Sequence, residues 1–253
     1  MALALARTRR ISLTGWLRAT IRIACMALLL IACVPLYYLH RLFSHHNPWP
    51  RVFLAGVAWI AGVDLTYRGS KAPGRVFLLA NHVSWIDIPA LAAATGTAFV
   101  GHDGLASMPL LKWLCAMADT VFVARHDRAS VARQVDSVRT ALSDTGALAI
   151  FPEGTTSDGT GLHAFKSSLL SAIEPLPEGI AVQPVLLHYG SEAPEIAWIG
   201  EEHGLDNFLR ILARGRPVKM EVRFLAPLSG AQLENRKTIA LAAREAILSE
   251  LQG

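Results

Sequence analysis

The sequence predicts an α/β fold with a largely parallel central sheet flanked by helices and an N-terminal membrane-embedded helical hairpin. After residue 67, short apolar segments alternate with amphipathic ones, which is typical of strands joined by helices. Residues 1–63 contain seven arginines, no acidic residue and two apolar stretches. Charged residues make up only 17% of the chain, which excludes a disordered protein. We therefore expect a membrane anchor over residues 1–66 and an α/β domain over residues 67–253.

The two apolar stretches near the N-terminus are both short. Ile23 to Leu39 has 17 uncharged residues and would reach about 25 Å as a helix, less than a hydrocarbon core of about 30 Å. Pro35 is expected to kink or end that helix. Val52 to Val63 has 12 residues. This shortness favours a hairpin in one leaflet, and a cleaved signal peptide, an organelle transit peptide, a single full span and a buried core helix remain alternatives.

Charge sets the expected topology and the expected partners. Because arginines stay on the cytoplasmic side, we expect an inner-membrane protein whose α/β domain lies on the cytoplasmic face, with the lipid bilayer as a partner. Beyond residue 63 the chain carries 17 basic and 20 acidic side chains, so we expect no nucleic acid partner. The three cysteines, an odd number without a C-x-x-C pair, predict neither disulfides nor a cysteine zinc site.

Apolar runs predict the strands of the α/β domain. The run at 75–80 is nearly continuous, which suits a strand buried on both faces. Further strands are expected at 97–100, 120–123, 147–151, 181–187 and 218–225. Helices are expected at about 86–94, 109–118, 131–142, 165–173 and 237–251. The helix at 131–142 is amphipathic, because its apolar positions recur with helical spacing at Val131, Val135, Val138 and Leu142.

Two polar clusters follow predicted strands, where ligands bind in open α/β sheets. One contains His82 and Asp87, and the other is the segment 151–159. Residues five apart do not share a helix face, so the pair requires His82 on a loop and Asp87 in the first turn of a helix. The carboxylate then holds one imidazole nitrogen and leaves the other as a base.

These clusters resemble motifs of the glycerolipid acyltransferase family. The first block is Asn81-His82-Val83-Ser84-Trp85-Ile86-Asp87, and the third block is Phe151-Pro152-Glu153-Gly154-Thr155. The second block matches at Pro109 and at Val121-Phe122-Val123-Ala124-Arg125, and the fourth matches at Val182-Gln183-Pro184-Val185. The resemblance covers about residues 70–190.

The resemblance implies direct acyl transfer from an acyl thioester, either acyl-ACP or acyl-CoA, without a cofactor or a metal. His82 would take the proton of an acceptor hydroxyl, and Asp87 would orient the imidazole. Arg125, Glu153, Gly154 and Thr155 would hold the acceptor. Backbone amides near Gly154 are candidates for stabilising the oxyanion. The chain has no G-x-S-x-G motif, so an acyl-enzyme is not expected.

Departures from the family pattern bear on the acceptor. Thr156 stands where phosphatidate-forming members usually have arginine, Asp158 adds an acid, and His102 replaces a lysine of the second block. A phosphate monoester favours paired cations. The expected acceptor is therefore a lysolipid without such a group, such as lyso-ornithine lipid or a lysophospholipid, and 1-acylglycerol-3-phosphate is the alternative.

Two other classes of protein compete with this interpretation. A metallohydrolase could use His82, Asp87, His102, Asp103 and Glu153 as ligands, although the chain lacks H-E-x-x-H spacing. A non-catalytic membrane scaffold would need no polar clusters at strand ends. Thioester consumption with and without a chelator distinguishes the three classes.

Overall fold

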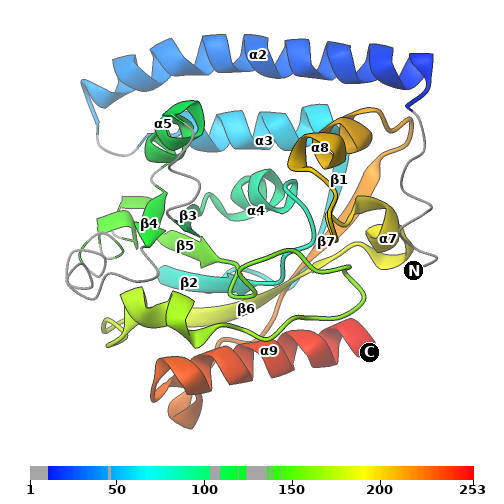
Figure 1. Ribbon diagram of the computed structural model, residues 1–253. Coiled ribbons are helices and arrows are strands. Elements are labelled where there is room, and N and C mark those ends of the chain that lie inside the picture. Colours follow the sequence, from blue (N-terminus) through cyan, green and yellow to red (C-terminus); the bar gives the residue numbers. More distant parts are fainter. Residues whose placement is uncertain are drawn as a thin grey trace.

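A computed structural model describes residues 11–44, 47–102, 109–118, 120–123, 136, 138, 140–142 and 144–253. Within these residues a seven-stranded sheet forms the centre of the molecule (Figure 1). Its strands are β1 (Val63–Arg68), β2 (Arg75–Ala80), β3 (Ala98–His102), β4 (Val121–Val123), β5 (Ala147–Ile150), β6 (Ile180–His188) and β7 (Val218–Phe224).

The sheet is largely parallel, as the sequence predicts. The strand order is β1-β7-β6-β2-β5-β3-β4. The five strands from β6 to β4 run in one direction. Strand β7 is antiparallel to β6, and β1 pairs in parallel with β7. The loops that follow β2, β5 and β6 therefore leave the same edge of the sheet, side by side.

Most predicted helices are present, with some differences in type and extent. The described helices of the domain are α4 (Asp87–Thr95), α5 (Pro109–Met117), α7 (Ala193–Ile196), α8 (Gly204–Leu212) and α9 (Arg236–Gln252). The helix expected at 165–173 is instead a 3-10 helix, η3 (Ser167–Ile173), in which the Ser171 hydroxyl donates to the Ser168 carbonyl. Serine side chains that bond nearby backbone in this way compete with α-helical bonding. Strand β1 and helices α7 and α8 correspond to no element predicted from the sequence.

Part of the helix expected at 131–142 lies outside the described residues. Val131 and Val135 belong to that part. Val138 and Leu142 are buried in the core, on the apolar side that the spacing predicts.

Alternating side chains of the strands fill two cores, one on each face of the sheet. On β2, Val76, Leu78 and Ala80 join the core on the side of α4 and α8. Phe77 and Leu79 join the core under α9. A strand whose two faces are both covered needs the unbroken apolar run that residues 75–80 provide. Figure 1 shows the resulting layers, with α9 on one side of the sheet and α4, α8 and the two N-terminal helices on the other.

The N-terminal apolar segments form two helices that lie side by side, α2 (Leu13–Arg41) and α3 (Trp49–Ala61) (Figure 1). The expected length of the first is wrong, because α2 has 29 residues, begins after the Ser12 cap and continues past Pro35. At about 43 Å it is long and apolar enough to cross a membrane, with a mean hydropathy of 2.2 over 18 residues. At the crossing, a Cβ on Gly56 would lie 2.4 Å from Leu29, so the helices meet closely there.

The hairpin is fastened to the α/β domain by arginines and by packing. Arg18 Nη1 donates to the Ala213 carbonyl at 2.8 Å, and Arg22 Nη1 donates to the Leu212 carbonyl at 2.9 Å. These carbonyls end α8, where cations are favourable. Helix α3 packs on α4, and Gly62 ends α3 in a left-handed conformation. The next residues form β1, which crosses the boundary expected at residue 66.

Many large apolar side chains of α2, α3 and the turn between them are exposed. The apolar residues of α2, α3 and the turn between them that are exposed are Leu13, Trp16, Leu17, Ile21, Ile23, Leu28, Ile31, Leu36, Tyr38, Leu39, Leu42, Phe43, Val52 and Trp59. So much exposed apolar surface marks an interaction site rather than the outside of a soluble domain.

Candidate active site

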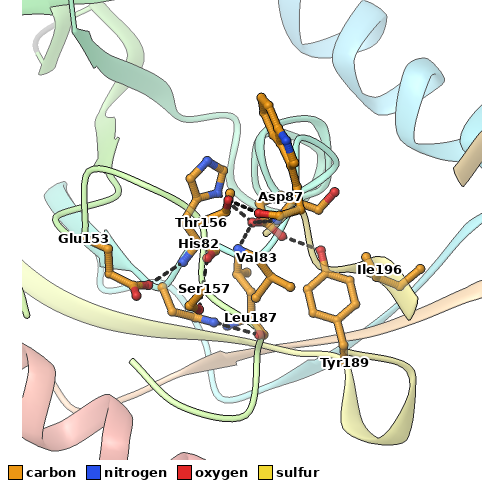
Figure 2. A network of polar contacts seen from close by, with 12 residues as sticks. His82, Val83, Asp87, Glu153, Thr156, Ser157, Leu187, Tyr189 and Ile196 are labelled. Atoms are coloured by element: carbon orange, nitrogen blue, oxygen red, sulfur yellow. Dashed lines mark hydrogen bonds and ion pairs between the residues drawn. The ribbon is translucent and has the colours of Figure 1, made fainter. Parts of the chain in front are cut away.

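His82 and Asp87 meet at the carboxyl edge of the sheet (Figure 2). His82 lies on the loop after β2, and Asp87 lies in the first turn of α4, as the spacing requires. The distance from His82 Nδ1 to Asp87 Oδ2 is 2.7 Å. When Asp87 is ionised it accepts the Nδ1 proton, which leaves Nε2 of the imidazole as the nitrogen that can accept another.

The Asp87 carboxylate is fully buried and saturated with donors. Its Oδ2 also accepts the backbone N–H groups of Val83 at 2.6 Å and Ser84 at 2.9 Å. Its Oδ1 accepts the phenol of Tyr189. A buried carboxylate is tolerated when it is hydrogen-bonded to this extent. The position of Asp87, and with it that of the imidazole, is therefore set by the fold.

Aromatic packing fixes the plane of the His82 ring. Phe151 stacks on the imidazole with ring centroids 4.2 Å apart and planes 18° apart. Phe99 stacks in turn on Phe151 at 6.0 Å. The His82 side chain is 17% exposed, so an acceptor can reach its outer nitrogen.

Glu153 ties two loops of the site together. Its Oε1 accepts the backbone N–H of His82 at 2.9 Å, and its Oε2 accepts that of His163 at 2.7 Å. The side chain is fully buried, and this burial raises the pKa of Glu153, partly offset by the two N–H donors. Both carboxylate oxygens thus face the protein backbone.

The turn after Glu153 is shaped by Gly154, whose φ of +67° is left-handed. The Gly154 N–H donates to the Phe151 carbonyl at 3.0 Å, so this amide is engaged within the turn. Thr155 is exposed on the turn, and its amide donates to no group in the part of the chain that the structure describes. Of the amides expected to stabilise an oxyanion, that of Thr155 is the better placed.

Thr156 and Ser157, which follow the expected site residues of the third block, contact the protein itself, and other candidate residues fall outside the described part of the chain. The Thr156 hydroxyl donates to the Trp198 carbonyl, and Ser157 N–H donates to the His82 carbonyl at 2.7 Å. Arg125 and Asp103 lie outside the described residues, as does the side chain of His102. Within the described residues, no group of three His, Cys, Asp or Glu side chains is arranged to hold a metal ion.

Three residues at or beside the site were not anticipated. Tyr189 contacts Asp87, and buried Asn207 accepts the Ser84 hydroxyl at 3.1 Å. The Lys166 ammonium lies beside the Gly154 turn, 3.2 Å from the position that a Cβ on Gly154 would take. No local sequence pattern marks Asn207 or Lys166. Tyr189 gives one usable signal, because it is a polar residue just beyond the end of a buried strand.

A histidine–aspartate pair at the carboxyl edge of a parallel sheet, with the carboxylate orienting the imidazole, defines a class of enzyme that uses histidine as a general base. Comparison with known proteins makes the class specific. Residues 64–188 match the family described as Acyltransferase.

The similar proteins with curated names are acyltransferases. A lyso-ornithine lipid O-acyltransferase of Rhodobacter capsulatus is 31% identical, and the match covers 94% of this chain and 91% of that protein. A 1-acyl-sn-glycerol-3-phosphate acyltransferase of Neisseria gonorrhoeae is 30% identical over 69% of each chain. The crystal structure of the 1-acyl-sn-glycerophosphate acyltransferase of Thermotoga maritima has the same fold, with a TM-score of 0.65, 18% identity and coverage of 93% and 94%. The chain therefore belongs to the acyltransferase family and is an acyltransferase.

Proposed function

We propose that the protein transfers a fatty acyl chain from an acyl thioester to the hydroxyl of lyso-ornithine lipid, at the membrane surface. The observation that carries the proposal is the contact of His82 Nδ1 with the buried carboxylate of Asp87. This contact engages one imidazole nitrogen and leaves Nε2 as the candidate base. The proposal is also supported by the Rhodobacter relative and by a 28% identical lyso-ornithine lipid O-acyltransferase of Brucella abortus that matches 94% of this chain.

The proposed step needs one base and one oxyanion donor. His82 Nε2 takes the proton of the acceptor hydroxyl as that oxygen attacks the thioester carbonyl. Asp87 stabilises the imidazolium that forms. The Thr155 amide stabilises the negative oxygen of the tetrahedral intermediate. The C–S bond then breaks, the acyl ester forms, and the thiolate of the carrier leaves. The thiolate recovers the proton from His82. The step uses no cofactor or metal.

The acceptor assignment follows from charge around the third block. The Thr156 hydroxyl is committed to the Trp198 carbonyl, so this position offers no cation to a phosphate. Asp158 is held as an anion, because the backbone N–H of Thr160 lowers the pKa of its carboxyl. An ornithine headgroup carries an ammonium and a carboxylate and no phosphate monoester. A site with a fixed acid favours it over a dianionic headgroup.

A second candidate acceptor is 1-acylglycerol-3-phosphate. Lys166 favours it, since its ammonium lies beside the Gly154 turn and would attract a phosphate as well as a carboxylate. The Neisseria relative carries the corresponding name.

The hairpin is proposed to lie flat on the inner membrane with the catalytic domain on the cytoplasmic face. Arg18 and Arg22 hold the first half of α2 against the end of α8. A spanning orientation of α2 would break these contacts. In the flat orientation the exposed apolar residues of both helices enter the lipid, as in interfacial helices.

An acceptor panel tests the function. The purified protein in detergent would be offered lyso-ornithine lipid, 1-acylglycerol-3-phosphate and lysophosphatidylcholine, each with the same acyl-ACP or acyl-CoA. We expect the highest kcat/KM with lyso-ornithine lipid and no effect of a chelator. A strong preference for 1-acylglycerol-3-phosphate would establish the second candidate instead, and loss of turnover with the chelator would contradict the metal-free step.

A further inference from the structure

Tyr189 completes the hydrogen bonding of the buried carboxylate in the site. Its phenol donates to Asp87 Oδ1, the oxygen that His82, Val83 and Ser84 do not use. Tyr189 itself is only 4% exposed. Figure 2 shows its ring rising from the end of β6 toward Asp87, on the side of the carboxylate away from the imidazole. The three side chains therefore form one chain of contacts from Tyr189 to His82.

The fold fixes the position of Tyr189 through the strand that precedes it. The Asn81 side chain donates to the Leu187 carbonyl at 3.1 Å and accepts the Leu187 N–H at 2.7 Å, which continues the pairing with β6 beyond the end of β2. Alternate residues share a face of a strand, so Tyr189 follows Val185 and Leu187 into the core beneath α4. Asp87 opens that helix.

Tyr189 acts as a donor over the whole working range of pH. Burial and the neighbouring Asp87 carboxylate both raise the pKa of the phenol well above its ordinary value. A neutral phenol next to an ionised carboxylate has only one arrangement available, in which its proton points to the carboxylate. Such a charge-assisted bond is stronger than a bond between neutral groups.

We propose that Tyr189 is a positioning residue for catalysis, which holds the Asp87 carboxylate and withdraws part of its negative charge from His82. The inference rests on the proposed role of His82 as the base. Without the phenol, the full charge of the carboxylate would act on the imidazole, which would then keep its proton to higher pH. Glu153 and His163 are other titratable groups near His82, and the hydrogen bonds of Glu153 join it to the His82 and His163 backbone rather than to Tyr189.

Tyr189→Phe tests the role, because it removes the hydroxyl and keeps the ring. We expect kcat to fall about tenfold, the KM of the acceptor to stay within about twofold, and the acid limb of the kcat/KM profile to move up by about half a pH unit. Tyr67→Phe is the matched control, since Tyr67 is exposed on β1, and it should behave as the wild type. An unchanged acid limb in Tyr189→Phe, with or without a lower kcat, would overturn the proposal.

A second variant covers the case in which Tyr189→Phe does not fold. With 3-fluorotyrosine placed at position 189 alone, the ring keeps its shape and the phenol becomes a stronger donor. The acid limb should then move to lower pH, opposite to the shift in Tyr189→Phe, and a limb at the wild-type pH would contradict the proposed role. Each assay uses the acceptor that the wild type consumes fastest. A wrong acceptor assignment therefore appears in the wild-type rates, and a wrong role for Tyr189 appears only in the variants.

Discussion

The Glu153 carboxylate accepts the backbone N–H of His82 at 2.9 Å, so the third sequence block holds the main chain of the first. Its other oxygen holds the N–H of His163, on the loop that leads to η3. The loop after β2 and two points of the loop between β5 and η3 are thus joined at one buried acid. Glu153 in the third block is expected to hold the acceptor. Its position in the structure also lets it fix the backbone of His82, the candidate base.

Replacement of Glu153 by glutamine should lower both activity and stability. An amide has one acceptor oxygen, so either the His82 or the His163 N–H would lose its partner, at a cost of about 1–3 kcal/mol in the free energy of unfolding. We expect a lower kcat because the His82 loop shifts, with the KM of the acceptor changed less. A KM effect that exceeds the kcat effect would favour direct contact of Glu153 with the acceptor.

The stability deficit of Glu153→Gln should depend on pH. Burial raises the pKa of Glu153 above its ordinary value of 4.5. A carboxyl group with a raised pKa in the folded state gives stability that is fully present below the unfolded value and is lost as pH rises through the folded value. Glutamine does not titrate. Denaturant unfolding in detergent should therefore show the largest deficit below the unfolded value and a smaller one at pH 7, and a deficit that widens with rising pH would contradict this.

His82→Ala should abolish most of the acyl transfer while the protein stays folded. Loss of a general base typically costs about 10²- to 10⁴-fold in rate. His163→Ala is the matched control, because the His163 side chain is exposed and its hydrogen bond to Glu153 is made by the backbone N–H. Turnover and thermal unfolding of both variants would be compared with the wild type. Wild-type turnover in His82→Ala would refute the assignment of the base.

Asp87→Asn should reduce kcat by about 100-fold or more without unfolding the protein. An asparagine can present its oxygen to the Val83 and Ser84 amides and its NH₂ group to Tyr189, so the buried contacts survive. The negative charge that stabilises the imidazolium is lost. Single-turnover rates would measure the effect, and a loss of less than about threefold would argue against a catalytic role.

Gly154→Ala should destabilise the turn for two reasons, and a control variant separates their contributions. The left-handed φ of +67° costs about 1 kcal/mol for any residue with a Cβ, and that Cβ would also press on Lys166 and Leu169. Gly74→Ala carries the same backbone penalty at φ +73°, with no atom within 4 Å. We expect the larger loss of stability in Gly154→Ala, and a loss of activity only there. Equal effects of the two variants would mean that the turn accommodates the added methyl group.

The parts of the site that are close in sequence could be predicted, because a strand followed by a polar loop dictates them locally. The buried run of β2 leads directly into His82, and five residues later Asp87 opens α4. Tyr189 and Asn207 could not be predicted in this way. They contact Asp87 and Ser84 across 102 and 123 residues of sequence. The pairing of β6 with β2 brings Tyr189 near, and Asn207 comes from α8.

The length of α2 illustrates the same limit. The uncharged stretch from Ile23 to Leu39 predicts a helix of 17 residues. The structure extends the helix back to Leu13, because Arg18 and Arg22 are satisfied by carbonyl groups about 190 residues away. Their partners lie in α8, a helix that the sequence pattern did not reveal.

The exposed apolar side chains of the hairpin should determine membrane binding. Ile31 on α2 and Trp59 on α3 are 67% and 79% exposed. Burial of each in lipid would contribute about 2 kcal/mol, and a carboxylate in its place would oppose insertion. The double variant Ile31→Glu and Trp59→Glu should therefore bind liposomes at least about tenfold more weakly in flotation assays.

The control for membrane binding lies on the opposite side of the sheet. Leu241 on α9 is 58% exposed, and Leu241→Glu makes the same chemical change away from the hairpin. If the hairpin lies flat with its apolar residues in one leaflet, Leu241→Glu should bind as the wild type does. A tag at Gly253 should then be accessible from the cytoplasmic face. A tag that is accessible only from the opposite face of the membrane would refute the flat orientation. Equal loss of binding in both variants would show that the attachment is not specific to the hairpin.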